Sequence, residues 1–163
     1  MRFSPREEFG PDGSDRAEFF LSTNPGEPLK PLRSVASGGE LSRVMLALKT
    51  VLSEQDELET IIFDEIDTGI SGRTAQMAAE RLSGLGRGRQ VLCITHLPQI
   101  AAMADHHYLI RKDTDGTRTW TAVKEIAGQE ITEELARLIG GTEITEGVLR
   151  TAEEMKTLAQ KRK

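Results

Sequence analysis

Two adjacent carboxylates, Asp64 and Glu65, end the apolar run Thr60-Ile61-Ile62-Phe63. This run predicts a buried strand over residues 60–64, and consecutive side chains of an extended segment point in opposite directions. One carboxylate can therefore hold Mg²⁺ while the other orients a water molecule. Asp67 adds a third acid in the following loop. The alternative interpretation is a strand end whose charges are simply solvated.

His96 follows a second apolar run, residues 91–95, which also predicts a buried strand. If the two strands are parallel, their carboxyl ends lie at one edge of the sheet, where open α/β folds bind ligands. His96 is then expected beside Asp64 and Glu65. Cys93 lies inside the apolar run and is interpreted as a buried structural thiol.

A third candidate is the segment Ser37-Gly38-Gly39-Glu40, which lies between a Pro-rich loop and an apolar helical pattern. Ser37 and Glu40 have the spacing of a capping box, which explains these two residues structurally. It does not explain two consecutive glycines in a first helical turn, each of which costs roughly 1 kcal/mol relative to alanine. Exposed N–H groups at a helix start bind phosphate, and glycine lets a ligand approach the backbone closely.

The elements around these residues alternate between strand and helix. A helix is predicted from Gly39 onward because its apolar residues recur at helical spacing, and a second helix is predicted with Ser71 as its N-cap. Pro98 predicts the start of a short third helix after the second strand. The order strand, helix, strand, helix indicates an α/β fold with a mostly parallel sheet flanked by helices.

The remaining segments predict smaller features. We expect a strand over residues 16–22 preceded by a turn at residues 10–13, then a loop over residues 23–34. A small antiparallel hairpin is predicted from residues 107–111 and 117–124, followed by helices over residues 130–139 and about 145–160.

Composition limits the class of protein. The chain has 163 residues and a formal net charge of −5, with one cysteine, so it is expected to form one domain without an internal disulfide. No apolar stretch is long enough to cross a membrane, and we expect a cytoplasmic location with no membrane partner. The acidic balance argues against nucleic-acid binding through bulk charge, so any DNA contact is local or supplied elsewhere.

The combined motifs resemble the C-terminal half of the P-loop ATPase heads of the ABC type. Ser37-Gly38-Gly39-Glu40 resembles the ABC signature, residues 61–65 resemble Walker B, residues 67–71 the D-loop, and His96 the switch histidine. The longer segments 35–43, 64–72 and 95–100 are similar to the RecN family of bacterial DNA repair proteins, which are SMC-like ATPases. Residues 24–28 and 131–141 add to this resemblance. Ala36 and Ser71 depart from general ABC heads, which usually carry leucine and aspartate there.

The resemblance implies specific roles in ATP hydrolysis. Asp64 would hold Mg²⁺, Glu65 would activate the attacking water, and His96 would contact the γ-phosphate of ATP. Ser37, Gly38, Gly39 and Glu40 would bind ATP held by the opposite head, with Asp67 and Ser71 in the D-loop. Two heads would then form a homodimer around two ATP molecules, in a protein that acts in DNA double-strand break repair and recombination.

The phosphate-binding motif G-x-x-x-x-G-K-[ST] does not occur in this sequence. We therefore expect residues 1–163 to be the C-terminal lobe of such a head, without the Walker A lobe and coiled coil, and to be inactive alone. The expected partners are a Walker A lobe of the same protein and DNA bound by the full-length protein.

Two alternatives are open from the sequence. Asp64, Glu65, Asp67 and His96 could form a metal site for phosphodiester hydrolysis, which would leave the glycine pair unexplained. A non-enzymatic module could instead dock a partner through its acidic surface.

Overall fold

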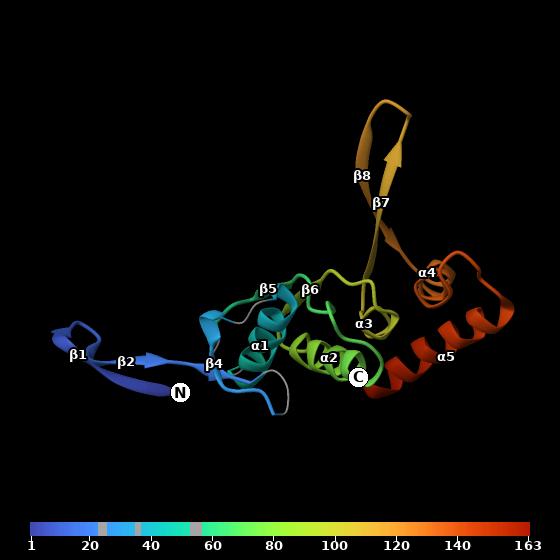
Figure 1. Cartoon of the computed structure of the whole chain (residues 1–163). Coiled ribbons are helices and arrows are strands. Elements are labelled where there is room, and N and C mark those ends of the chain that lie inside the picture. The colour runs from blue at the N-terminus through green and yellow to red at the C-terminus, as the bar shows by residue number, and fades with distance from the viewer. Residues whose placement is uncertain (23–25, 35–36, 53–56) are drawn as a thin grey trace.

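The structure is a computed structural model that describes residues 1–22, 26–34, 37–52 and 57–163. It contains strands, α-helices and one short 3₁₀ turn, arranged around a central helical body from which two hairpins project (Figure 1). In chain order these elements are β1 (Arg2–Gly10), β2 (Gly13–Glu18), β3 (Phe20–Leu21), β4 (Lys30–Pro31), η1 (Leu32–Ser34), α1 (Gly38–Val51), β5 (Thr60–Phe63), α2 (Gly72–Leu85), β6 (Gln90–Cys93), α3 (Pro98–Ala102), β7 (His107–Thr114), β8 (Thr119–Ile126), α4 (Gln129–Gly140) and α5 (Glu146–Arg162).

The strands β5 and β6 form a parallel pair, and Phe63 lies opposite Cys93 at its carboxyl end. Helix α2 connects the two strands, as a parallel connection requires. The predicted α/β class is confirmed. Among the described residues this is the one parallel pair, and the three other strand pairs are antiparallel. Of the mostly parallel sheet that we predicted, the described residues contain one two-stranded parallel pair.

The core lies on one side of this pair, where β5 and β6 pack against the helices. Phe63 and the loop residue Ile66 are buried together with small and aliphatic side chains of α1 to α5. The buried set is Leu46, Phe63, Ile66, Ala79, Leu82, Leu85, Ile100, Ala102, Met103, Leu135, Ala136, Ala152 and Ala159. Alanines in α2, α4 and α5 allow the helices to approach closely.

The opposite face of the pair is uncovered, which corrects the expectation of two fully buried strands. Ile62 is 66% exposed, and Leu92 and Ile94 are also exposed. An apolar run with both alternating positions apolar is typical of a strand covered on both faces. In this chain only one of those faces has a covering layer among the described residues.

Helix α1 shows the same contrast. The predicted helix is confirmed, but its apolar stripe of Leu41, Met45, Leu48 and Val51 is exposed, and Leu46 is the buried leucine. The periodicity correctly identified a helix because the stripe follows helical spacing. Within the described residues, however, no layer covers this stripe.

The hairpins are antiparallel and project from the body (Figure 1). The predicted turn at residues 10–13 joins β1 to β2, and the predicted strand 16–22 is divided into the end of β2 and β3. The predicted loop 23–34 contains β4 and η1, while residues 23–25 lie outside the described part. The hairpin of β7 and β8 is confirmed with longer strands than expected.

The C-terminal helices α4 and α5 agree with the predicted ranges to within about two residues. Gly141, with φ of 68°, ends α4 in a conformation that favours glycine. Thr145 caps α5 by accepting a hydrogen bond from the Val148 N–H at 3.4 Å. No helix in the described ranges is both long and apolar enough to cross a membrane.

Candidate functional site

A hollow of about 230 Å³ lies at the carboxyl edge of β5 and β6. Asp64, Glu65, Asp67 and Thr68 line it from the loop after β5, and Ile94, Thr95 and His96 line it from the segment after β6. The parallel register brings these two segments together because it places Phe63 opposite Cys93. Asp64, Glu65 and His96 therefore meet at one edge, as the sequence predicted.

The loop after β5 makes a sharp turn at Glu65. Glu65 has φ of 56°, which non-glycine residues rarely adopt and which costs on the order of 1–3 kcal/mol. The Asp64 carboxylate accepts the Glu65 N–H at 2.9 Å, and the Glu65 carbonyl accepts the Thr68 N–H at 3.0 Å. The turn is thus held locally, and it directs Asp64 and Glu65 from successive positions into the same hollow.

Two side chains of α1 hold this loop from the other side. The Ser42 hydroxyl donates to the Asp64 carbonyl at 2.8 Å, and Arg43 donates to the carbonyls of Ile66 and Thr68 at 3.1 and 2.8 Å. The sequence interpretation gave these two residues no role. Their spacing from Gly39 was the available signal, because residues three and four apart lie on one face of a helix.

The glycine pair at the start of α1 lies directly against this loop. A Cβ atom on Gly39 would stand 2.8 Å from the Glu65 carbonyl oxygen and 2.9 Å from Thr68, and one on Gly38 would collide with the Glu65 carboxylate. From the sequence alone, the glycine pair was explained by the close approach of a ligand to the backbone. Gly39 is buried, and packing against the loop after β5 explains why a residue without a side chain is needed there. Gly38 and Ser37 are exposed at the helix start.

The predicted capping box is half present. The Ser37 side chain accepts the Glu40 N–H at 3.2 Å, which is one of its two bonds. Ser71 occupies the N-cap position of α2, as predicted. Its side chain, however, makes no capping hydrogen bond. Ser71 does not line the hollow, and Val35, Ala36, Asn24 and Pro25 of the resemblance lie outside the described residues.

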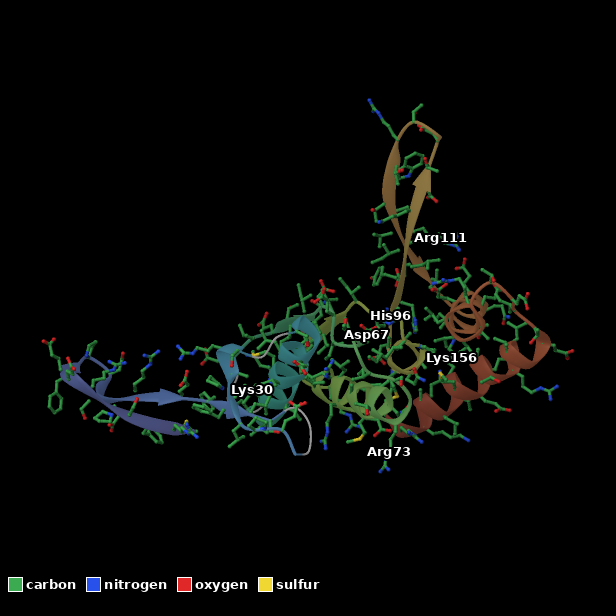
Figure 2. All side chains as sticks on the ribbon, in the orientation of Figure 1. Lys30, Asp67, Arg73, His96, Arg111 and Lys156 are labelled. Atoms are coloured by element: carbon green, nitrogen blue, oxygen red, sulfur yellow. The ribbon has the colours of Figure 1, made fainter. Side chains whose placement is uncertain are left out.

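Asp67 is the most buried polar residue of the site, with 3% exposure. One of its oxygens, Oδ2, accepts the Thr95 hydroxyl at 2.6 Å and the His96 N–H at 2.8 Å, and lies 3.0 Å from His96 Nδ1. Figure 2 shows Asp67 and His96 together in the middle of the molecule. Asp67 therefore links the two strand ends, a role that its place in the sequence did not indicate.

The hollow is acidic. Three carboxylates and one histidine line it, and none of its described lining residues is Lys or Arg. The same charges act on Cys93, whose pKa is raised to about 12 by burial and by Asp67 and Asp64. Cys93 is consequently a neutral thiol, as its interpretation as a structural residue requires.

The donor set at the hollow fits Mg²⁺. Mg²⁺ is commonly bound through one or two carboxylates, with waters and substrate phosphates as its other ligands. Asp64 is exposed at the hollow and offers one such carboxylate. No group of three His, Cys, Asp or Glu within the described ranges could hold a metal ion unaided.

The chain is similar in sequence to several bacterial proteins named DNA repair protein RecN. It is 53% identical to the protein of Halalkalibacterium halodurans over 154 residues, which are 94% of this chain and 27% of that protein. Identity to the Bacillus subtilis protein is 54% over 143 residues, or 88% of this chain and 25% of that protein. The Streptomyces coelicolor protein is 44% identical over 147 residues, 90% and 26% of the two chains. The chain thus spans about a quarter of the length of these relatives.

No family model matches the chain. A solved structure from work on the structural biochemistry of ATP-driven dimerization and DNA stimulated activation of SMC ATPases aligns over 82% of this chain and 84% of its own, with a TM-score of 0.46 and 20% sequence identity.

Proposed function

Because this chain belongs to the RecN family over the quarter of RecN length that it spans, we propose that it is the signature and Walker B half of an SMC-like ATPase head. The observation that carries the proposal is the meeting of Asp64, Glu65 and His96 in one hollow beside the start of α1. The proposed context is DNA double-strand break repair and recombination in the cytoplasm, at the nucleoid.

Asp64 is proposed to hold Mg²⁺, which would supply positive charge to offset the negative charge of the phosphates. Glu65 follows it on the strained turn and is proposed to orient and deprotonate the attacking water. Its carboxylate is exposed at the hollow, so water can reach it. His96 is proposed to contact the γ-phosphate from the neighbouring strand end.

The acidity of the hollow supports the proposal that a second lobe is needed to bind ATP. A triphosphate is repelled by three carboxylates unless cations accompany it, and the described lining residues supply none. A Walker A lobe would bring a lysine and a row of backbone N–H groups to the phosphates. We propose that this lobe comes from elsewhere in the same protein and that residues 1–163 alone do not hydrolyse ATP.

The uncovered apolar surfaces support the same proposal. Ile62, Leu92 and Ile94 form an exposed face on the parallel pair, and the stripe of α1 is exposed as well. Contiguous apolar surface of this kind marks an interface. We propose that the Walker A lobe covers the sheet face and completes the core.

The exposed start of α1 is proposed to bind ATP of a second head. Ser37 and Gly38 are exposed there, and N–H groups at the start of a 14-residue helix favour a phosphate. Closure of two heads over two ATP molecules makes the nucleotide part of the interface. Hydrolysis then removes negative charge from that interface and releases the heads.

The phosphodiesterase alternative is less well supported. It requires Asp67 and His96 as open metal ligands, whereas Asp67 is buried and already accepts hydrogen bonds from Thr95 and His96. We therefore retain the ATPase proposal and treat metal-dependent nuclease activity without ATP as an outcome that would overturn it.

The proposal is tested with Glu65→Gln in the complete protein. ATP turnover is expected to fall about 10²–10⁴-fold, the usual contribution of a general base, while ATP-dependent dimerisation of the heads persists. The control is Glu153→Gln, the same change at an exposed residue of α5. Near-normal turnover in Glu65→Gln would remove Glu65 from this role and would also be the outcome expected of a simple docking module.

A further inference from the structure

Asp67 differs from the two other acids of the hollow in its surroundings. It is 3% exposed, whereas Asp64 and Glu65 are exposed. Burial of a carboxylate is costly unless hydrogen bonds compensate for the lost water, and Oδ2 has the Thr95 hydroxyl at 2.6 Å and the His96 N–H at 2.8 Å. The position of Asp67 is therefore fixed from the opposite strand end.

The His96 ring has the opposite character. Its side chain is 71% exposed, so packing alone does not determine the orientation of the imidazole. Its Nδ1 atom, however, lies 3.0 Å from Asp67 Oδ2. An ionised carboxylate has no proton to donate, so a hydrogen bond across this distance requires the hydrogen on Nδ1. The second nitrogen, Nε2, is then the ring atom left for a ligand.

We propose that Asp67 is a positioning residue for His96, which it holds through Nδ1 so that Nε2 is presented to the hollow. This inference rests on the proposed function, in which His96 contacts the γ-phosphate of ATP. A buried carboxylate performs the same task in other proteins, where it fixes the tautomer and orientation of a catalytic or metal-bound histidine. Here the pair connects the loop after β5 to the end of β6, so the orientation of His96 depends on the segment that carries Asp64 and Glu65.

In a purely structural role, Asp67 would not determine the orientation of the His96 ring. In that case its bonds to the Thr95 hydroxyl and to the His96 N–H would hold the strand ends together, and the ring would be free. The state of the ring nitrogens therefore distinguishes the two roles.

The first test is nitrogen-15 NMR of the imidazole rings in this chain, at a pH at which the histidines are neutral. Three histidines are present, and His96→Gln assigns the signals of His96. We expect the proton of His96 on Nδ1. A proton found only on Nε2 in the unsubstituted chain would overturn the proposal, and this measurement needs no variant at the buried position.

Variants then separate the two roles. Asp67→Ala should release the proton to Nε2, and Asp67→Asn, whose side-chain oxygen can still accept, should retain the Nδ1–H form. Thr95→Val is the matched control: it removes the hydroxyl bond to Asp67 and leaves the Asp67 carboxylate beside Nδ1, so the His96 ring signals should not change. An Asp67→Ala chain that folds with the native His96 signals would overturn the proposal.

The last arm uses ATP turnover by the complete protein. Asp67→Ala is expected to lower kcat by about 10–100-fold, with a smaller change in KM, and Asp67→Asn is expected to recover part of the loss. Native kcat in an Asp67→Ala protein that has lost the Nδ1–H form would overturn the positioning role. If the unsubstituted complete protein hydrolyses no ATP, the proposed function fails, while the ring measurement still decides whether Asp67 fixes His96.

Discussion

The carboxyl edge of β5 and β6 differs from the outer faces of β5, β6 and α1 in what this chain supplies. At the edge, the loop after β5 is held by Ser42 and Arg43, and Asp67 ties it to Thr95 and His96. On the outer faces, large apolar side chains such as Ile62 and Val51 are 66% and 81% exposed. The chain thus forms this edge from its own residues but leaves apolar surface that a further layer would cover.

This difference indicates how the work is divided in the proposed head. The groups that would act on water and on the γ-phosphate are positioned within these residues, so they do not depend on a partner for their arrangement. In the proposed head, binding the triphosphate and completing the core depend on a partner lobe. Substitutions in the two regions should therefore affect different properties of the protein.

The largest effect is expected at the exposed start of α1. Ser37→Arg should abolish ATP-dependent dimerisation of the complete protein, because a large cationic side chain would occupy the proposed phosphate site and remove the cap bond to Glu40. ATP binding by a single head should persist. Dimerisation is measured by size-exclusion chromatography with light scattering.

Ser34→Arg is the control for this substitution, since Ser34 is exposed just before the helix start. If Ser37→Arg heads dimerise at native ATP concentrations, the start of α1 does not bind the nucleotide of the opposite head.

The next effect concerns the uncovered sheet face. Ile62→Asp should leave the folding of this chain unchanged because the residue is 66% exposed, yet weaken association with a Walker A lobe by at least tenfold. The loss reflects about 1.5–3 kcal/mol of missing apolar burial together with the cost of burying a charge. Isothermal titration calorimetry measures it.

Met77→Asp on α2 provides the comparison, since Met77 is also exposed and apolar. Equal affinities for the Ile62→Asp and Met77→Asp chains would show that the outer sheet face is not the surface that the second lobe covers.

Substitution of the two glycines at the start of α1 should show which of them the fold itself requires. Gly39→Ala is expected to destabilise the chain by about 1–3 kcal/mol, because its Cβ would meet the backbone of Glu65 and Thr68. Gly38→Ala meets only the end of the flexible Glu65 side chain, so it should change the free energy of unfolding by less than about 1 kcal/mol. Urea unfolding measures both, and equal losses would contradict the packing assigned to Gly39.

The smallest effect is a dependence of stability on pH at the base of the β7–β8 hairpin. Burial lowers the pKa of His107 below its ordinary value of 6.5, and Lys156 adds to the shift. The unfolded chain then binds more protons than the folded chain, so stability from this group is complete above pH 6.5 and decreases as the pH falls below it. His107→Gln should reduce the loss of thermal stability on acidification.

His106→Gln is the control for that substitution, because His106 is exposed and lies 3.6 Å from Glu125. If acidification destabilises the His107→Gln chain as much as the unsubstituted one, His107 does not contribute to the pH dependence.

The sequence was sufficient for the elements and for the shared edge. Apolar runs and helical spacing located β5, α2 and β6, and the alternation of strands and helices predicted that Asp64 and His96 would meet. It was not sufficient to predict the hydrogen bonds of Asp67, whose partner Thr95 is 28 residues away, or of Arg43, which donates to a carbonyl 25 residues away. Such contacts depend on how the segments pack, and no local pattern encodes them.

The same limit explains the error about burial. Alternating and continuous apolar patterns report which side chains favour a covered position, and Ile62 and Leu41 both do. They do not report whether the covering segment belongs to the same 163 residues. Exposure of these residues could be learned only from the folded chain.

The central claim is that these residues supply one part of a divided ATPase site, and it is tested most directly by mixing this chain with a Walker A lobe of a RecN protein. ATP turnover is measured for each component alone and for the mixture. We predict turnover in the mixture and none from either component alone. Turnover by this chain alone, or a mixture no more active than its separate components, would contradict the account.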